Sequence, residues 1–420
     1  MYCGRFPGGS TPAADLTAER PMPGSDDGHR PAGGTAARRA PAVAFRQFVV
    51  KLHSRCDLAC DHCYVYTMAD QRWRSRPRSM PDRVLDWTAR RIGEHARAHR
   101  LDRVAVILHG GEPLLAGSAR IERAVTEIRQ FAAPVPVRMT VQTNGTRLDE
   151  AFLRLFDRLD VGVSVSLDGD RAAHDRHRRG PDGRGSHDRV TARLRRLTDG
   201  YPHLFNGLLC TVDLRNDPVT TYRSLLAHRP PAVDFLLPHG SWSAPPPGRA
   251  PDSRQAPYAA WLTAVFDEWY HTPGQQIRVR LFDEIIQVLL GGASRLAGVG
   301  TSPVAVAVVQ TDGAVELDDT LGAAHPDAAR TGLHVARDPF DAALDLPAVR
   351  AQQAGLDALC ATCRACDVAR VCGGGLRTHR YRTGSGFDNP SVYCPDLYPL
   401  IGHIRHTVRR DVAALRAAVR

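Results

Sequence analysis

Between residues 45 and 237, short apolar runs alternate with longer segments in which apolar residues recur every three or four positions. Such runs are typical of buried strands, and the periodic segments are typical of helices packed against them. The pattern predicts strands at 45–52, 104–108, 137–142, 161–167, 204–212 and 233–237, and helices at 81–99, 121–131, 150–159 and 189–197. Strands that alternate with helices form right-handed units in a parallel sheet. We therefore predict an α/β fold, a partial (β/α)6 TIM barrel.

The pattern changes after residue 245, where a Pro-rich stretch marks a boundary. Beyond it we predict two helices, a β hairpin and a loop-rich segment with many cysteines. The expected divisions are a disordered tail at 1–44, the barrel at 45–245, a helical bridge at 246–300, a domain of hairpin and cysteine-rich segment at 301–396, and a C-terminal helix at 397–420.

Composition narrows the possible partners and the compartment. The chain has 420 residues and a net charge of +10, but its basic residues are nearly all Arg, with Lys51 the only lysine, and they are interspersed with carboxylates. This distribution does not indicate nucleic-acid binding. The longest apolar runs are strand-sized, and residues 1–44 contain no apolar signal segment, so we expect no membrane span and a cytoplasmic location. Eight of the ten cysteines fall in two groups, which favours metal ligation in a reducing compartment over disulfides.

The first cysteine group, Cys56, Cys60 and Cys63, has C-x3-C-x2-C spacing just after the first predicted strand. Three thiolates from one loop can hold three irons of a 4Fe-4S cube and leave the fourth iron open. A structural zinc site or three ordinary buried thiols is the alternative, but zinc sites usually pair two C-x2-C knuckles. With His62 before the last cysteine, the loop resembles the cluster loop of the radical S-adenosylmethionine (SAM) superfamily. The resemblance implies that SAM binds the open iron, and that an electron from a flavodoxin- or ferredoxin-type donor cleaves it to a 5'-deoxyadenosyl radical.

Further motifs follow the next strands, at the end of a parallel barrel where active sites form. Gly110, Gly111, Glu112 and Pro113 follow the second strand, where glycines let the backbone approach a ligand and a carboxylate can bind an ammonium group. Placed one unit after the cysteine loop, this turn resembles the superfamily's motif for the amino group of SAM. Taken alone, the polar residues that end the next strands are ordinary strand caps. The resemblance to maturases of the superfamily implies that Asn144, Ser166 and Asp168 face the cofactor or the substrate. It also implies that Arg178 contacts a carboxylate. Pro238 to Trp242 is expected at the substrate mouth.

The second cysteine group contains Cys360, Cys363, Cys366 and Cys372, followed later by Cys394. Four of these thiols can also form a zinc ribbon. Cys363, Cys366, Cys372 and Cys394 resemble the SPASM extension of peptide-modifying radical enzymes, where these positions hold an auxiliary 4Fe-4S cluster.

The SPASM pattern is incomplete in this chain. Leu376 and Asp318 stand where that family has cysteines, so a second auxiliary cluster is in doubt, and Cys360 is an additional thiol. Asp319 occupies the place of a catalytic base in anaerobic sulfatase-maturating enzymes, although a solvent-facing turn carboxylate is the alternative. Cys210, in the fifth strand, is expected in the core.

Residues 236–239, 372–382 and 386–394 resemble the FxsB-type radical SAM/SPASM maturases, and the resemblance extends over 45–404. It implies an enzyme that modifies a ribosomally made precursor peptide by joining an aromatic ring to the β carbon of a nearby residue, a cyclophane crosslink. Two alternatives remain. One is oxidation of Cys or Ser to formylglycine, against which the missing hairpin cysteine argues, and the other is an iron–sulfur or zinc protein without catalysis.

Overall fold

The computed structural model describes residues 42–250, 253–274 and 277–418, and it confirms the parallel α/β barrel. Neighbouring strands pair in parallel from the first to the sixth, and their inward side chains are buried. The bounds are β1 Gln47–His53, β2 Val104–Gly110, β3 Val137–Thr143, β4 Val161–Ser166, β5 Phe205–Thr211 and β6 Ala232–Leu236. All six predicted strands are therefore present, each within a few residues of its expected bounds.

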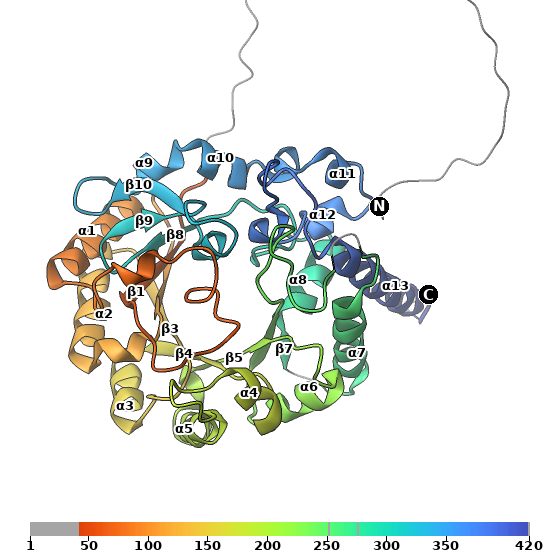
Figure 1. Cartoon of the computed structure of the whole chain (residues 1–420), viewed down its shortest axis with the longest axis horizontal. Coiled ribbons are helices and arrows are strands. Elements are labelled where there is room, and N and C mark those ends of the chain that lie inside the picture. The colour runs from red at the N-terminus through yellow and green to blue at the C-terminus, as the bar shows by residue number, and fades with distance from the viewer. Residues whose placement is uncertain (1–41, 251–252, 275–276, 419–420) are drawn as a thin grey trace, which may run out of the picture.

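Helices cover the outside of this sheet (Figure 1). They are α1 Asp82–Ala98, α2 Ser118–Ala132, α3 Glu150–Arg158, α4 Arg171–His177, α5 His187–Gly200 and α6 Pro218–Leu226. In α1 the apolar residues Val84, Leu85 and Ile92 face the sheet and are buried. Of these six, α4 and α6 were not predicted, because both are shorter than ten residues and too brief to show a clear helical repeat. An aspartate caps each of them: Asp170 accepts from the Ala173 amide, and Asp217 accepts from the Thr220 amide.

The sheet is larger than the barrel strands alone. Its order is β10-β9-β8-β1-β2-β3-β4-β5-β6-β7, which adds β7 Arg278–Val279, β8 Val306–Val309, β9 Ala314–Glu316 and β10 Arg330–His334. The predicted hairpin is formed by β8 and β9, and β8 pairs in parallel with β1, Val308 opposite Val49. The hairpin expected to open a separate domain thus continues the barrel sheet beyond β1.

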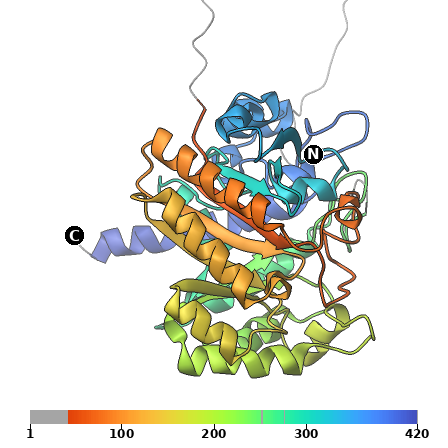
Figure 2. The same cartoon turned by 90° about the vertical axis from the view of Figure 1, so that its left-hand side faces the viewer.

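The remaining helices close the molecule on the β7 and β8 sides. They are α7 Pro257–His271, α8 Arg280–Leu289, α9 Asp341–Leu344, α10 Pro347–Gln353, α11 Ala361–Arg364, α12 Ala369–Cys372 and α13 Cys394–Ala418. Helix α13 begins at Cys394, within the segment expected to be cysteine-rich loop, and its far end projects from the body (Figure 2).

Within the described ranges, no helix is long and apolar enough to cross a membrane. Most of the predicted tail, residues 1–41, lies outside the described residues. Its last part is held in place, because Val43 exchanges two hydrogen bonds with the side-chain amide of Gln353.

Candidate active site

One cavity lies at the carboxyl ends of the barrel strands, where the loop after β1 crosses the opening (Figure 1). The structure brings together at its wall the predicted residues Cys56, Cys60, His62, Cys63, Gly110, Gly111, Asn144, Ser166, Arg178, Pro238 and His239. Sequence reasoning missed other residues of the wall, among them Tyr64, Tyr66, Leu209 and Thr211. The strand-end motifs therefore share one site, as a parallel barrel requires.

The three thiols have the surroundings of metal ligands. Cys56 Sγ accepts weak hydrogen bonds from the Leu58 amide at 3.4 Å and from Asn144 Nδ2 at 3.5 Å. Burial raises the pKa of Cys60 to about 11 and also raises the pKa values of Cys56 and Cys63, so free thiols here would be protonated at neutral pH. Thiolate ligands form when a metal displaces those protons. The three sulfurs thus fit an iron–sulfur cluster that is bound with proton release.

Asp57 anchors the cysteine loop to the end of β3. Its Oδ1 accepts from Asn144 Nδ2 at 2.9 Å, and its Oδ2 accepts from Thr146 Oγ1 at 2.9 Å and from Arg147 Nε at 3.0 Å. The predicted residue Asn144 therefore positions the loop as well as contacting Cys56.

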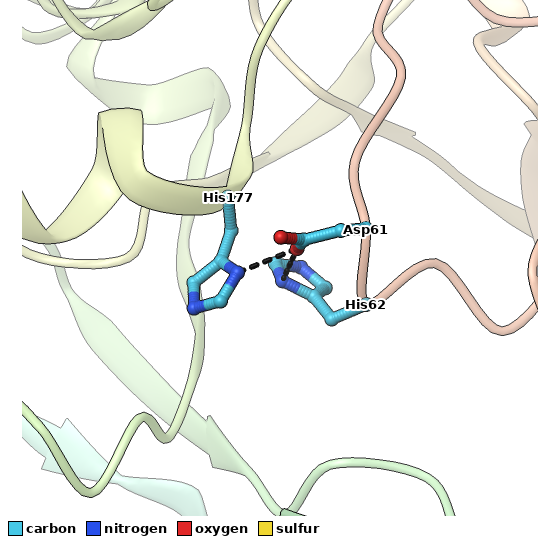
Figure 3. Close-up of side chains that lie close together, drawn as sticks. All are labelled: Asp61, His62 and His177. Atoms are coloured by element: carbon cyan, nitrogen blue, oxygen red, sulfur yellow. Dashed lines mark hydrogen bonds and ion pairs between the residues drawn. The ribbon is translucent and has the colours of Figure 1, made fainter.

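A second attachment joins the loop to the end of α4, as Figure 3 shows for Asp61, His62 and His177. His177 Nδ1 lies 2.5 Å from Asp61 Oδ1, and its Nε2 accepts from the Arg215 guanidinium at 2.6 Å. The three side chains are close enough to share a cation. Both nitrogens of His177 already have hydrogen-bond partners, however, so we interpret the group as a clasp between loop and helix.

The glycines after β2 are required by close packing. A Cβ on Gly111 would lie 1.8 Å from the hydroxyl of Tyr66, and Gly110 adopts φ +157° with its missing Cβ against the His53 carbonyl. Glu112 has no exposed surface and accepts from the amides of Leu114 and Asn144 and from the hydroxyl of Thr143. In this structure the carboxylate thus ties the β2 loop to β3 from behind the wall, and Pro113 begins the buried turn Pro113–Ala116.

The predicted residues Asp168 and Arg178 bind each other. Arg178 Nε donates to Asp168 Oδ2 at 2.6 Å, and Arg178 Nη2 donates to Asp168 Oδ1 at 3.2 Å, which makes the pair bidentate. Asp168 Oδ1 also accepts a hydrogen bond from the Thr211 amide. Asp168 is buried, whereas Arg178 reaches the cavity wall. The positive charge of Arg178 lowers the pKa of Cys60, whereas burial, the larger effect, raises it.

Asp319, the expected base, lies beside a smaller neighbouring cavity that Lys51 and Tyr64 also line. Lys51 Nζ lies 2.7 Å from Asp319 Oδ2, and the Tyr64 hydroxyl donates to the same oxygen at 2.7 Å. Burial alone would raise the pKa of this carboxyl, but Lys51 holds it well below its usual range. The neighbouring Asp318 has its pKa raised to about 6 by burial and by the charge of Asp319. Asp319 is therefore a buried partner of Lys51, not the solvent-facing carboxylate of the alternative interpretation.

The second cysteine group is compact. The sulfurs of Cys363 and Cys360 interact directly, and burial followed by the nearby Cys360, Cys394 and Cys372 raises the pKa of Cys363. Burial and the nearby Cys394 raise the pKa of Cys372 to about 12. Each of the five thiols, Cys360 and Cys366 included, therefore lies near another thiol of the group. Cys210 is buried in β5 as expected.

Arg380 closes the loop that follows Cys372. Gly373, Gly374 and Gly375 all adopt left-handed conformations, with φ between +58° and +75°. This curvature turns their three carbonyls towards the guanidinium of Arg380, which donates to each of them. The result is a buried cation beside the thiols, which suits a cluster that carries net negative charge.

The two positions that lack cysteines face one cavity. Asp318 and Leu376 both line it, together with Arg377, Arg380 and backbone of the 296–304 segment. Among the described residues of this wall none is a cysteine, so the structure gives a second auxiliary cluster no thiolate ligands at this place.

Three comparisons relate the chain to known proteins. The radical SAM superfamily matches residues 50–212. A cysteine-type anaerobic sulfatase-maturating enzyme of Clostridium perfringens is 26% identical over 267 residues, which cover 62% of this chain and 70% of the relative. A serine-type enzyme of Klebsiella aerogenes is 32% identical over 153 residues, covering 36% of this chain and 35% of the relative.

Solved structures share the fold. Native anSMEcpe with bound AdoMet and a peptide superposes with a TM-score of 0.74 at 21% identity, covering 89% of this chain and 99% of that one. Streptococcus suis SuiB bound to the precursor peptide SuiA gives a TM-score of 0.56 at 12% identity, covering 84% and 76%. The superfamily match spans β1 to β5, which carry the three cysteines and most of the cavity wall. Residues 50–212 therefore form a radical SAM domain, and the chain is an enzyme.

Proposed function

We propose that this enzyme removes two electrons and two protons from a side chain of a peptide. The single observation that carries the proposal is the cavity that joins three partly exposed thiols to the strand-end residues of the barrel, with a second group of five thiols in the same chain. The names of the relatives and the bound peptides of the two structural neighbours support a peptide substrate.

The residues of the cavity fit the cofactors. Cys56, Cys60 and Cys63 would hold a 4Fe-4S cluster, and the bound cluster and SAM supply the radical that abstracts a hydrogen atom, after reduction by an external flavodoxin- or ferredoxin-type donor. His62, Gly110, Gly111, Asn144, Ser166 and Arg178 line the space for SAM, with Arg178 the cation for its carboxylate. Glu112 and Asp168 hold these residues in place from behind.

The auxiliary cluster would accept the second electron. Cys363, Cys366, Cys372 and Cys394 are its proposed ligands, and Cys360 interacts with Cys363 as a further thiol. Arg380 supplies a buried positive charge beside them.

The first candidate product is the aldehyde formed by oxidation of a peptide Cys or Ser, because the relatives carry the names of cysteine-type and serine-type maturating enzymes. The second candidate is a crosslink between an aromatic ring and a β carbon. It is favoured by the cysteine-free cavity at Asp318 and Leu376, where this chain departs from the full pattern of cysteines.

The test uses three pools of synthetic peptides, which contain Cys, Ser, or an aromatic residue two positions from an aliphatic one without Cys or Ser. The reconstituted enzyme is incubated anaerobically with SAM and dithionite, beside a Cys56, Cys60, Cys63 triple alanine variant. We expect 5'-deoxyadenosine and a modified peptide from the wild type alone. A product that reacts with a hydrazide identifies an aldehyde. A peptide whose mass falls by two hydrogens, and which gives no fragments between the two joined residues in tandem mass spectrometry, identifies a crosslink. A wild type that forms neither 5'-deoxyadenosine nor product at full iron content would refute the proposal.

A further inference from the structure

Three histidines around the active site have ring nitrogens without a partner. Seven buried side-chain nitrogens and oxygens of the described chain lack a hydrogen bond, and three of them belong to His109, His239 and His379. Leaving such an atom buried and unpaired destabilises the folded protein. Unpaired polar atoms that gather at one place therefore point to a functional use.

Two of these histidines, His109 and His239, line the active-site cavity. Both Lys51 and Asp319 act on His109, and the positive charge of Lys51, which opposes a second charge on the ring, has the larger effect; on His239 the carboxylate of Asp319 acts without such an opposing cation. Burial lowers the pKa of His239 to about 4, so its imidazole is neutral at physiological pH and can accept a proton. Of the two, His239 has the better surroundings for becoming an imidazolium.

Behind His239 lies the third histidine. The ring of His379 is centred 5.7 Å from that of His239, and on its other side it meets Tyr393 at 4.8 Å. Tyr393 precedes Cys394, and the residue after His379 is Arg380, which closes the loop after Cys372. The histidine pair therefore spans the distance from the active-site cavity to the second cysteine group.

The other groups that face His239 are accounted for. The Tyr64 ring is centred 4.8 Å from the imidazole, and the hydroxyl of Tyr64 is engaged by Asp319. Asp319 itself accepts hydrogen bonds from Lys51 and Tyr64, and the charge of Lys51 holds its pKa low, so its oxygens are already engaged and it is a lasting negative charge. Its position favours a positive charge on His239.

We propose that His239, which the ring of His379 backs on the side of the auxiliary cysteines, accepts the proton released when the substrate radical is oxidised. The inference rests on the proposed function. Once a hydrogen atom has been abstracted, the peptide radical must lose one electron and one proton to become a closed-shell product. The electron passes to an auxiliary iron–sulfur cluster, and the proton leaves an O–H, S–H or ring C–H bond for the imidazole nitrogen of His239. Loss of the O–H proton from a Ser radical gives the aldehyde directly. Loss of the S–H proton from a Cys radical gives a thioaldehyde, which water converts to the aldehyde with release of hydrogen sulfide. Loss of the ring C–H proton, after the carbon radical has added to the ring, completes a crosslink.

The first test compares His239→Ala with the wild type on whichever peptide pool the wild type modifies. We expect product formation to fall by about 10²-fold or more, the usual contribution of a general base. 5'-Deoxyadenosine should still form, so its ratio to product rises. Added imidazole should restore product in His239→Ala, a rescue that a purely structural role would not give. His239→Asn serves if the alanine variant loses iron, and His403→Asn, at a surface ion pair with Asp267, controls for the loss of a histidine.

Several results would overturn the inference. One is an unchanged rate and ratio in both His239 variants, and another is loss of 5'-deoxyadenosine together with product at full iron content. A further readout does not depend on turnover, namely histidine-selective 15N NMR of the enzyme with oxidised clusters. The signal that is missing in His239→Ala should belong to a neutral ring at pH 7 and titrate near pH 4. A charged ring at pH 7 would overturn the inference, whether or not any peptide pool is modified. Failure to modify any peptide pool would count against the proposed function instead.

Discussion

Titration of the Glu112 carboxyl should make the free energy of unfolding depend on pH. Burial raises the pKa of this carboxyl to about 7, above its ordinary value of 4.5. A raised pKa in the folded state gives stability that is fully present below pH 4.5 and is lost as the pH rises through 7. The difference corresponds to about 3 kcal/mol. Glu112→Gln cannot titrate, so between pH 4.5 and 8 the wild type should lose about that much more free energy of unfolding than the variant.

Urea denaturation of the cluster-free proteins at several pH values measures this difference. At low pH the variant should be the less stable by about 1–3 kcal/mol, because its NH2 group faces the amide of Asn144. Glu94→Gln, at an exposed ion pair with Arg91, is the matched control and should change the free energy of unfolding by less than about 1 kcal/mol. Parallel curves for wild type and Glu112→Gln would show that this carboxyl does not titrate in the range.

The buried pair of Lys51 and Asp319 should show strong coupling. The side chains are 6% and 13% exposed, so removing one charge leaves the other desolvated and unpaired. We expect Lys51→Met to lower the free energy of unfolding by about 3–5 kcal/mol, and the double variant with Asp319→Asn to cost less than the two single changes added together. The exposed pair Arg46 and Asp102, 62% and 74% exposed, is the control and should couple by less than about 1 kcal/mol. Additive effects at Lys51 and Asp319 would contradict the buried ion pair.

At the scale of single residues, the sequence predicts candidate metal ligands more readily than it predicts the residues that hold them in place. Cys56, Cys60 and Cys63 are recognisable because their spacing within one loop is itself the requirement for a shared cluster. The partners of Asp319 were not predicted, since Lys51 and Tyr64 lie more than 250 positions away and no local pattern links them to it. The same holds for Glu112, whose hydrogen bonds depend on where β3 ends.

At the scale of elements, the glycine turn after α12 should decide whether the auxiliary centre forms. Gly373 has φ +58°, and a Cβ there would lie 1.8 Å from the carbonyl oxygen of Gly300. Alanine at this position must displace backbone and should disturb the loop between Cys372 and Arg380. We expect iron in reconstituted Gly373→Ala to fall from about eight to about four atoms per chain, the content of the remaining cluster.

Iron and sulfide analysis after anaerobic reconstitution provides the measurement. Gly384→Ala is the matched control, because Gly384 also has a positive φ of +91° but its added Cβ meets no atom within 4 Å. It should keep about eight irons. Full iron in Gly373→Ala would mean that the close approach to Gly300 does not shape the centre, and about twelve irons in the wild type would indicate a third cluster.

Element prediction from sequence succeeded where an apolar pattern was long enough to read. The six barrel strands and most of the long helices were found, whereas β7, with two residues, and β10, with a central glycine, gave no such pattern. The parallel pairing of β8 with β1 was also not predicted, because a strand's apolar residues do not specify which distant strand will lie beside it.

At the scale of the whole molecule, that pairing bears on whether the chain has one folding unit or two. Strand β1 carries the first cysteine loop and lies between β2 and β8. The loop is further tied to the hairpin, because Arg76 pairs with Glu316 in addition to the contacts of Asp319. A boundary near residue 300 would therefore cut a continuous sheet and leave Lys51 without its carboxylate.

We accordingly expect the barrel and the C-terminal cysteine region to unfold together. Urea unfolding of the holoenzyme, followed by near-ultraviolet circular dichroism and by the visible absorbance of the clusters, should give coincident transitions. Val308→Ala removes buried atoms opposite Val49 and should cost about 2 kcal/mol, shifting both signals equally although the substitution lies in the hairpin. If the C-terminal region were an independent domain, Val308→Ala would move the absorbance of the auxiliary cluster alone, and a chain ended after residue 300 would fold with its first cluster intact. Because β1 would then expose a long unpaired edge, we expect that shortened chain to aggregate.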